Sequence, residues 1–157
     1  RLVEEEGTFS KEFFLRIEKN RMWICEKYRR YDLENLWNQN SKVLSDIKKY
    51  CDKRKVELLI AIFPDQFQVE EDLRQEVFFK YNLQEDSIDL YYPNKLLLIF
   101  CKQNNIHCVD LTEQFKKNTK FLKLYAIRDT HWNEEGNKLA AKIIFNYIKE
   151  NKLVKAK

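Results

Sequence analysis

The sequence predicts an α/β fold in three layers, with helices on both faces of a parallel sheet. Two short apolar stretches rich in β-branched residues, residues 56–63 and 106–111, have the composition of buried strands. Segments whose apolar residues recur every three or four positions stand before, between and after them. Because parallel strands need helical crossovers, this alternation indicates α/β layering. The length of 157 residues is that of a single domain, residues 1–157.

The first third of the chain is expected to hold two helical segments and the first strand. Residues 1–30 carry large apolar side chains in a partly helical pattern, so they need a surface to pack on. Residues 32–54 have the spacing of a long amphipathic helix, for which Asp32 is the expected N-cap. The stretch 56–63 then predicts a buried strand that Pro64 closes.

The middle of the chain is expected to hold a helix, a turn, a second helix and the second strand. Residues 68–81 are helical in character, and residues 86–92 indicate an extended or turn segment. Pro93 suits the first turn of a helix, which ends at Asn104. The strand at 106–111 follows directly.

The last third is expected to hold one short and one long helix. Asp110 and Glu113 have the spacing of a capping box, which predicts a short helix ending near Lys117. Residues 134–151 have the pattern of a final amphipathic helix. Asn133 is its expected N-cap, followed by two glutamates that suit a first helical turn.

Composition and charge argue against several classes of protein. The 29 basic residues exceed the 25 acidic ones by 4, but both signs are interleaved along the chain, which argues against a nucleic-acid surface. The apolar runs are far shorter than the ~20 residues of a transmembrane helix, so no transmembrane segment is expected. Four widely spaced cysteines and two histidines form no metal-binding pattern, so no metal is expected. The compartment stays open between cytoplasmic and exported.

The residues that carry chemistry lie just before the final helix. Asp129 and His131 are two positions apart, so in an extended loop both side chains project to the same side. The carboxylate can then accept the imidazole Nδ1–H, which leaves Nε2 to take a proton from a nucleophile. A surface or helix-capping pair is the alternative interpretation of these two residues.

Four further residues are candidates for a substrate pocket. Trp132 is expected to pack under the loop and fix the histidine, and lining an acyl pocket is its alternative role. Pro64, Asp65 and Gln66 follow the first predicted strand. Because α/β folds bind ligands at the carboxyl ends of their strands, these three residues are expected near the same site.

The motif around the histidine resembles that of the SGNH/GDSL hydrolase superfamily. The resemblance covers about residues 32–150, is strongest over 106–148, and rests on the run Asp129-Thr130-His131-Trp132-Asn133, with Gly136 and a helix containing Ala140-Ala141 after it. The motif is similar to that of SGNH esterases and of the alginate O-acetyltransferase-like branch. This resemblance implies a flavodoxin-like parallel sheet, Asp129 and His131 as the base half of a catalytic triad, and no metal or organic cofactor.

The chain also departs from that family. It contains no Gly-Asp-Ser and no Gly-x-Asn-Asp, so the family's serine nucleophile and oxyanion-hole residues have no counterparts here. It has two glycines where average usage would give about eleven. We therefore expect the C-terminal portion of a larger SGNH-like domain, with the nucleophile in an absent N-terminal part. A degenerate, non-catalytic relative is the alternative.

Taken with the resemblance, these residues favour a serine esterase or acyl hydrolase acting on a small-molecule or carbohydrate ester. The alternatives are a carbohydrate O-acetyltransferase and a non-catalytic binding or scaffold domain. Two short strands make a thin sheet with exposed apolar surface. We therefore expect association with the absent portion or with a second copy.

Overall fold

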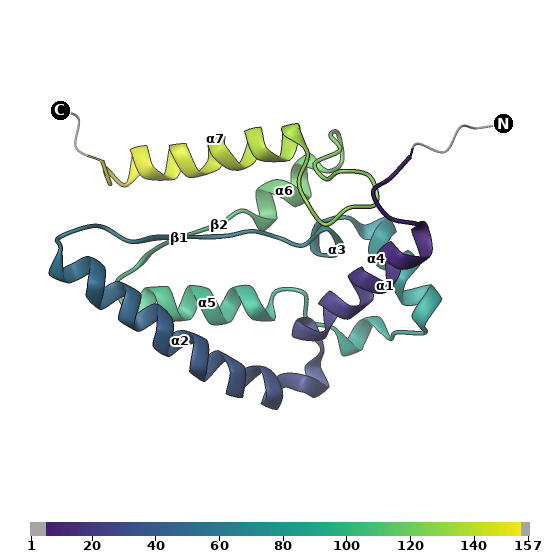
Figure 1. The fold of residues 1–157 in the computed structure, drawn as a ribbon, viewed down its shortest axis with the longest axis horizontal. Helices are drawn as coiled ribbons and strands as arrows, with labels where there is room; N and C mark the ends of the chain where they lie inside the picture. The colour runs from purple at the N-terminus through teal and green to yellow at the C-terminus, as the bar shows by residue number, and fades with distance from the viewer. Residues whose placement is uncertain (1–5, 155–157) are drawn as a thin grey trace.

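The computed structural model describes residues 6–154 and arranges them in three layers (Figure 1). A sheet of two strands, β1 (Leu59–Ile62) and β2 (His107–Asp110), forms the middle layer. Helices α6 (Thr112–Asn118) and α7 (Glu134–Glu150) lie on one side of it, and α2 (Arg30–Lys53) and α5 (Tyr92–Gln103) on the other. The predicted α/β/α layering is confirmed.

The two strands are parallel, as predicted, and pair in register from Leu59 opposite His107 to Ile62 opposite Asp110. Both are shorter than the apolar stretches that predicted them. The first strand, predicted to be buried, is less so than expected, because the three residues before Ile62 in β1 are only half-buried. In the part of the chain that the structure describes, each strand has one sheet neighbour, so its second edge has no strand beside it.

Alternation along the strands divides the core between the two helical layers. Leu59 and Ala61 of β1 pack in one cluster with Val109, under α6 and α7. Ile60 and Cys108 pack in a second cluster with residues of α5 and α2. Successive side chains of a strand point to opposite faces, so each layer receives every second residue.

A third core cluster lies beyond the carboxyl ends of the strands, where Figure 1 places α1, α3 and α4. Its residues come from α1 (Lys11–Arg21), the 3-10 turn η1 (Met22–Cys25), α3 (Gln66–Val69), α4 (Glu71–Tyr81) and Ile88. The turns η2 (Lys27–Arg29) and η3 (Glu85–Ser87) follow η1 and α4 along the chain. Met22, Phe67 and Val77 are completely buried in it. Leu15, Met22 and Cys25 of the first thirty residues thus pack here, whereas Phe13 is exposed.

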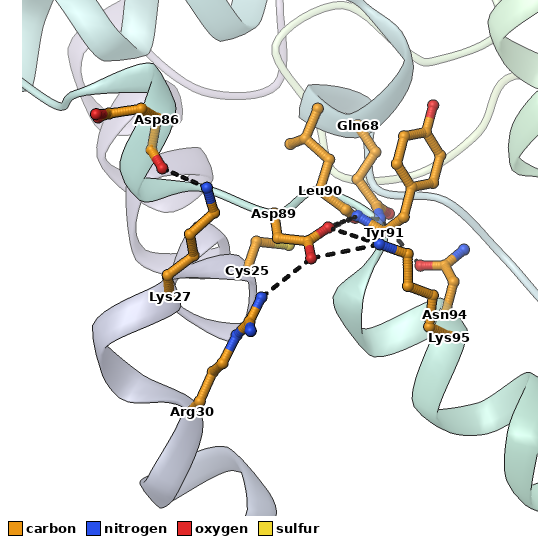
Figure 2. Close-up of polar contacts among 10 residues, drawn as sticks. All are labelled: Cys25, Lys27, Arg30, Gln68, Asp86, Asp89, Leu90, Tyr91, Asn94 and Lys95. Carbon is orange, nitrogen blue, oxygen red and sulfur yellow. Dashed lines mark hydrogen bonds and ion pairs between the residues drawn. The ribbon is translucent and has the colours of Figure 1, made fainter.

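Ion pairs connect the third cluster to the layer formed by α2 and α5. Figure 2 shows Asp89 between Arg30 of α2 and Lys95 of α5. The Asp89 carboxylate lies 3.1 Å from Arg30 Nη2 and 3.3 Å from Lys95 Nζ. The amino ends of α2 and α5 are therefore held to one point of the turn that follows η3.

Three boundary predictions need correction. Helix α2 begins at Arg30, so Asp32 lies in its first turn and is not the N-cap. The single helix expected at 68–81 is two helices, because the extended backbone of Glu70 separates α3 from α4. The capping box at the start of α6 is absent.

Helix α6 is capped in a different way. Its N-cap position is Leu111, which has no side chain able to cap, and Asp110 Oδ1 instead accepts a hydrogen bond from the backbone N–H of Thr112 at 2.9 Å. The carboxylate that was expected to cap from the N-cap position therefore acts from one residue earlier.

Helix α2 has an exposed apolar surface. It contains no buried residue, and Val43, Ile47 and Tyr50 are each more than two-fifths exposed. Association with another portion or copy stays a prediction. None of the helices within residues 6–154 is long and apolar enough to cross a membrane.

Candidate active site

The loop between α6 and α7 is closed by backbone hydrogen bonds. Tyr125 and Trp132 form an antiparallel bridge, and Ala126 N donates to His131 O at 3.0 Å. At the tip, Arg128 has a φ of 48°, the left-handed conformation that lets the chain reverse. These backbone contacts therefore hold Asp129 and His131 in fixed positions.

Asp129 and His131 form a hydrogen-bonded pair in this loop. The Nδ1 atom of His131 lies 2.6 Å from Asp129 Oδ1, and the same oxygen accepts the backbone N–H of His131 at 3.0 Å. Hydrogen bonds from the Thr8 hydroxyl and from His131 lower the pKa of Asp129 to about 2. The carboxylate is therefore charged at neutral pH, and it fixes the imidazole with Nδ1–H toward Asp129 and Nε2 outward.

The imidazole is open to its surroundings. The side chain of His131 is 84% exposed, whereas that of Asp129 is 14% exposed. Nε2 is thus accessible to a reacting group that approaches from outside the loop, while the oxygen that orients the ring is shielded.

An open cavity of about 430 Å³ adjoins the pair. It lies between the carboxyl end of β1, the end of α1, the loop and the first turn of α7, and it is lined by Arg21, Phe63, Pro64, Asp65, Thr130, His131, Trp132 and Asn137. Its position at the carboxyl end of a parallel strand is the usual place for ligands in α/β folds.

The structure brings three of the four predicted pocket residues to this cavity. Pro64, Asp65 and Trp132 line it together with His131. It places Gln66 outside the lining, where the side-chain amide donates to Glu70 Oε2 at 2.7 Å. The end of β1 and the loop are linked directly, because the buried Tyr125 hydroxyl donates to Pro64 O at 2.8 Å.

Aromatic rings form one wall of the cavity. The ring of Trp132 lies 4.6 Å from that of Phe63 and 5.1 Å from that of Phe115, measured between centroids. Phe115 is completely buried, whereas Phe63 is about half exposed. Trp132 therefore packs under the loop on one side and offers an apolar surface beside His131 on the other.

Another part of the cavity lining comes from α1, and the sequence pattern did not identify it. Arg21 forms an ion pair with Asp65, the residue that caps α3. Behind it Glu18 is completely buried, with Oε1 4.0 Å from Arg21 Nη1. Burial raises the pKa of Glu18 to about 7, Arg21 opposes this rise, and Asp65 adds to it. Only long-range contacts distinguish these residues from other charged residues of an amphipathic helix.

No serine of this chain lines the cavity. Ser10 caps α1, Ser41 and Ser45 hydrogen-bond within α2, and Ser87 lies in η3. Within residues 6–154 no group of three or more potential metal-binding side chains is close enough together to hold a metal ion.

Comparisons with known proteins agree with this architecture. The structure of the O-acetyltransferase domain of Pseudomonas putida AlgJ has a TM-score of 0.63 with this chain at 17% sequence identity. The match covers 79% of this chain but 42% of the AlgJ chain, so these residues span less than half of that structure. No curated protein sequence matches the chain. The family model of the SGNH hydrolase-like domain of the acetyltransferase AlgX matches residues 22–157, and the chain therefore belongs to this family.

Proposed function

We propose that this chain carries the base half of an acyl-transfer site that moves an acetyl group to a carbohydrate hydroxyl. The observation that supports this most directly is the 2.6 Å contact between His131 Nδ1 and Asp129 Oδ1 at the edge of the cavity. Membership in the AlgX acetyltransferase family favours transfer to a sugar over the alternative, simple ester hydrolysis.

In this proposal the nucleophile is a serine from outside residues 6–154. His131 Nε2 takes the serine proton as the serine oxygen attacks the carbonyl carbon of a donor ester. The bond between the carbonyl carbon and the donor oxygen breaks, and the departing alcohol receives the proton from His131. The charged Asp129 stabilises the imidazolium that exists between these two proton transfers.

The second half-reaction uses the same two residues. A sugar hydroxyl gives its proton to His131 Nε2 and attacks the acetyl-serine carbonyl. The acetyl–serine bond then breaks, and the serine oxygen recovers the proton from His131. The acetyl group ends on the sugar, so water is needed only if the site acts as an esterase.

The cavity walls suit a sugar acceptor. The exposed faces of Trp132 and Phe63 offer an aromatic surface on which the apolar face of a sugar ring can lie. Arg21, Asp65 and Asn137 line the same cavity and supply donors and acceptors for hydroxyl groups. An apolar wall with a few convergent polar groups is the usual composition of a small-molecule site.

The test measures acetyl transfer by the full-length protein from a chromogenic acetyl ester to an oligosaccharide, with the product identified by mass spectrometry. His131→Gln is compared with the control His107→Gln. His107 is the first residue of β2, whereas the cavity lies at the carboxyl end of the sheet, and its ring packs against Tyr147 of α7. We expect acetylated acceptor from the wild-type protein and from His107→Gln only. Equal transfer by His131→Gln contradicts the proposal, and ester cleavage without acetylated acceptor favours the esterase.

A second candidate is a non-catalytic SGNH-like binding domain. The observation that favours it is that none of the four serines here lies at the cavity. A full-length protein that binds oligosaccharides but neither transfers acetyl groups nor reacts with a fluorophosphonate serine probe would have this function.

A further inference from the structure

The segment before α1 lies against the loop that carries Asp129 and His131. Thr8 N donates to Ile127 O and Phe9 N donates to Arg128 O, both at 3.1 Å. Gly7 sits so close to the loop that an added Cβ would lie 2.7 Å from Ile127 O. Residues 7–9 therefore lie against the backbone of the loop immediately before Asp129.

This segment lies outside the part of the chain that defines the family. The family match begins at residue 22, so residues 7–9 and the whole of α1 precede it. The contacts with the loop are thus made by residues that the family pattern does not include.

Within this segment, Thr8 lies beside Asp129. Asp129 accepts two hydrogen bonds from His131, through its backbone N–H and its imidazole. The backbone contacts of Thr8 and Phe9 with the loop bring the Thr8 side chain to this carboxylate, and it is the strongest influence that lowers the pKa of Asp129. The His131 donors move with the loop, whereas Thr8 belongs to a different segment and links the carboxylate to the body of the protein.

The body to which Thr8 is tied is well anchored. Ser10 caps α1 by accepting a hydrogen bond from Phe13 N, and the buried side chain of Leu15 enters the third core cluster. At its other end α1 is held by the ion pair between Arg21 and Asp65. A displacement of the loop would consequently have to break its contacts with a packed helix.

We propose that Thr8 is a positioning residue of the active site, which holds the Asp129 carboxylate in the orientation that directs His131 Nε2 into the cavity. Its role as an aid to catalysis rests on the proposed acetyl transfer. Its role in orienting the histidine does not, because that orientation exists before any substrate binds.

The first measurement follows the imidazole of His131 by nitrogen-15 NMR of the full-length protein, with signals assigned by their loss in His131→Gln. In the wild-type protein we expect the Nδ1–H tautomer and slow exchange of its proton. Thr8→Val removes the hydroxyl at nearly constant shape, so it should lower the population of that tautomer and speed the exchange. Thr8→Ser, which keeps the hydroxyl, should restore both.

A second variant perturbs the same contact without removing the hydroxyl. Gly7→Ala forces the segment away from Ile127 O and should change the His131 signals in the same direction as Thr8→Val. Thr119→Val, at the C-cap of α6, removes a hydroxyl that bonds to Val69 O and Lys116 O, and it serves as the control. Unchanged His131 signals in both Thr8→Val and Gly7→Ala would overturn the proposal.

Acetyl transfer supplies the catalytic readout. Misplacement of a catalytic base lowers the rate of the chemical step more than substrate binding, so Thr8→Val should reduce kcat by about tenfold or more with little change in KM. A wild-type protein without transferase activity would refute the proposed function while the NMR result still decided the positioning. A normal kcat in Thr8→Val beside an active wild type would refute the catalytic role of Thr8.

Discussion

Two carboxyl groups, Asp129 and Glu18, each contact a residue that lines the cavity, and their surroundings act on the two groups in opposite directions. Asp129, on the loop, accepts hydrogen bonds from Thr8 and His131, which lower its pKa to about 2. Glu18, in α1, is completely buried, and burial raises its pKa to about 7. Hydrogen bonds favour the charged form and desolvation the neutral form. The loop thus supplies a negative charge beside the histidine, whereas α1 keeps its carboxyl largely neutral in mildly acidic solution.

The largest expected effect comes from removing the charge of Asp129. Asp129→Asn keeps the shape of the side chain but no longer stabilises the imidazolium or fixes the ring with Nδ1–H inward. We expect acetyl transfer to fall by about a thousandfold or more, as for the corresponding change in serine hydrolases. Asp86→Asn, in the exposed turn η3, is the matched control. A fall of less than a few-fold in steady-state rate would show that the pair is not the catalytic base.

Glu18→Gln tests the other side of the comparison through the pH dependence of stability. The folded-state pKa of about 7 lies above the ordinary value of 4.5, so the folded state favours the protonated carboxyl. The stability that protonated Glu18 preserves is fully present below pH 4.5. It is lost as the pH rises through 7 and the buried carboxyl ionises. Glutamine cannot ionise, so at about pH 8 we expect Glu18→Gln to be more stable than the wild type by about 3 kcal/mol.

Chemical denaturation at a series of pH values measures this difference. Glu12→Gln, on the exposed side of the same helix, should leave the pH profile unchanged. If the wild type and Glu18→Gln lose stability in parallel as the pH rises, Glu18 is not the group with the raised pKa.

Gly136→Ala should weaken the contact between the loop and α7. Gly136 is buried, and an added Cβ would lie 2.2 Å from Leu124 O and 2.9 Å from Trp132 Cβ. Because one of these neighbours is backbone, relief requires the loop to move, and we expect a loss of about 2 kcal/mol. Thermal unfolding measures it. A variant as stable as the wild type would mean that the loop moves without loss of stability.

The smallest expected effect concerns the cap of α7. The Asn133 side chain accepts from Gly136 N at 3.0 Å and donates to Lys123 O at 2.7 Å, so it links the helix to the loop. Asn133→Ala should cost about 1 kcal/mol of stability. Asn146→Ala, on the exposed surface of α7, should cost less, and equal losses in the two variants would contradict the capping role.

Local signals in the sequence predicted the loop side of the site well. Asp129 and His131 pair across two positions, in a bend of the loop where an extended chain was expected, and Asn133 caps α7 through a contact three residues away. Pro93 likewise lies in the first turn of α5. Each of these features depends on neighbours in sequence, so a pattern reveals it.

The α1 side could not be predicted in the same way. Arg21 meets Asp65 and Thr8 meets Asp129 only after the chain has folded, and nothing in their local sequence distinguishes them from surface residues. Asp110 shows the converse, because its spacing from Glu113 suggested a capping box that α6 does not use. Contacts between distant segments decided the first two cases, and sequence periodicity carries no information about them.

The most direct test of the central claim is labelling of the full-length protein with a fluorophosphonate probe, which reacts with a serine that a neighbouring base activates. We expect one serine to be labelled in the wild type and in His107→Gln, and labelling to be abolished in His131→Gln and strongly reduced in Asp129→Asn. Equal labelling of His131→Gln and the wild type would contradict the assignment of Asp129 and His131 as the base half of the active site.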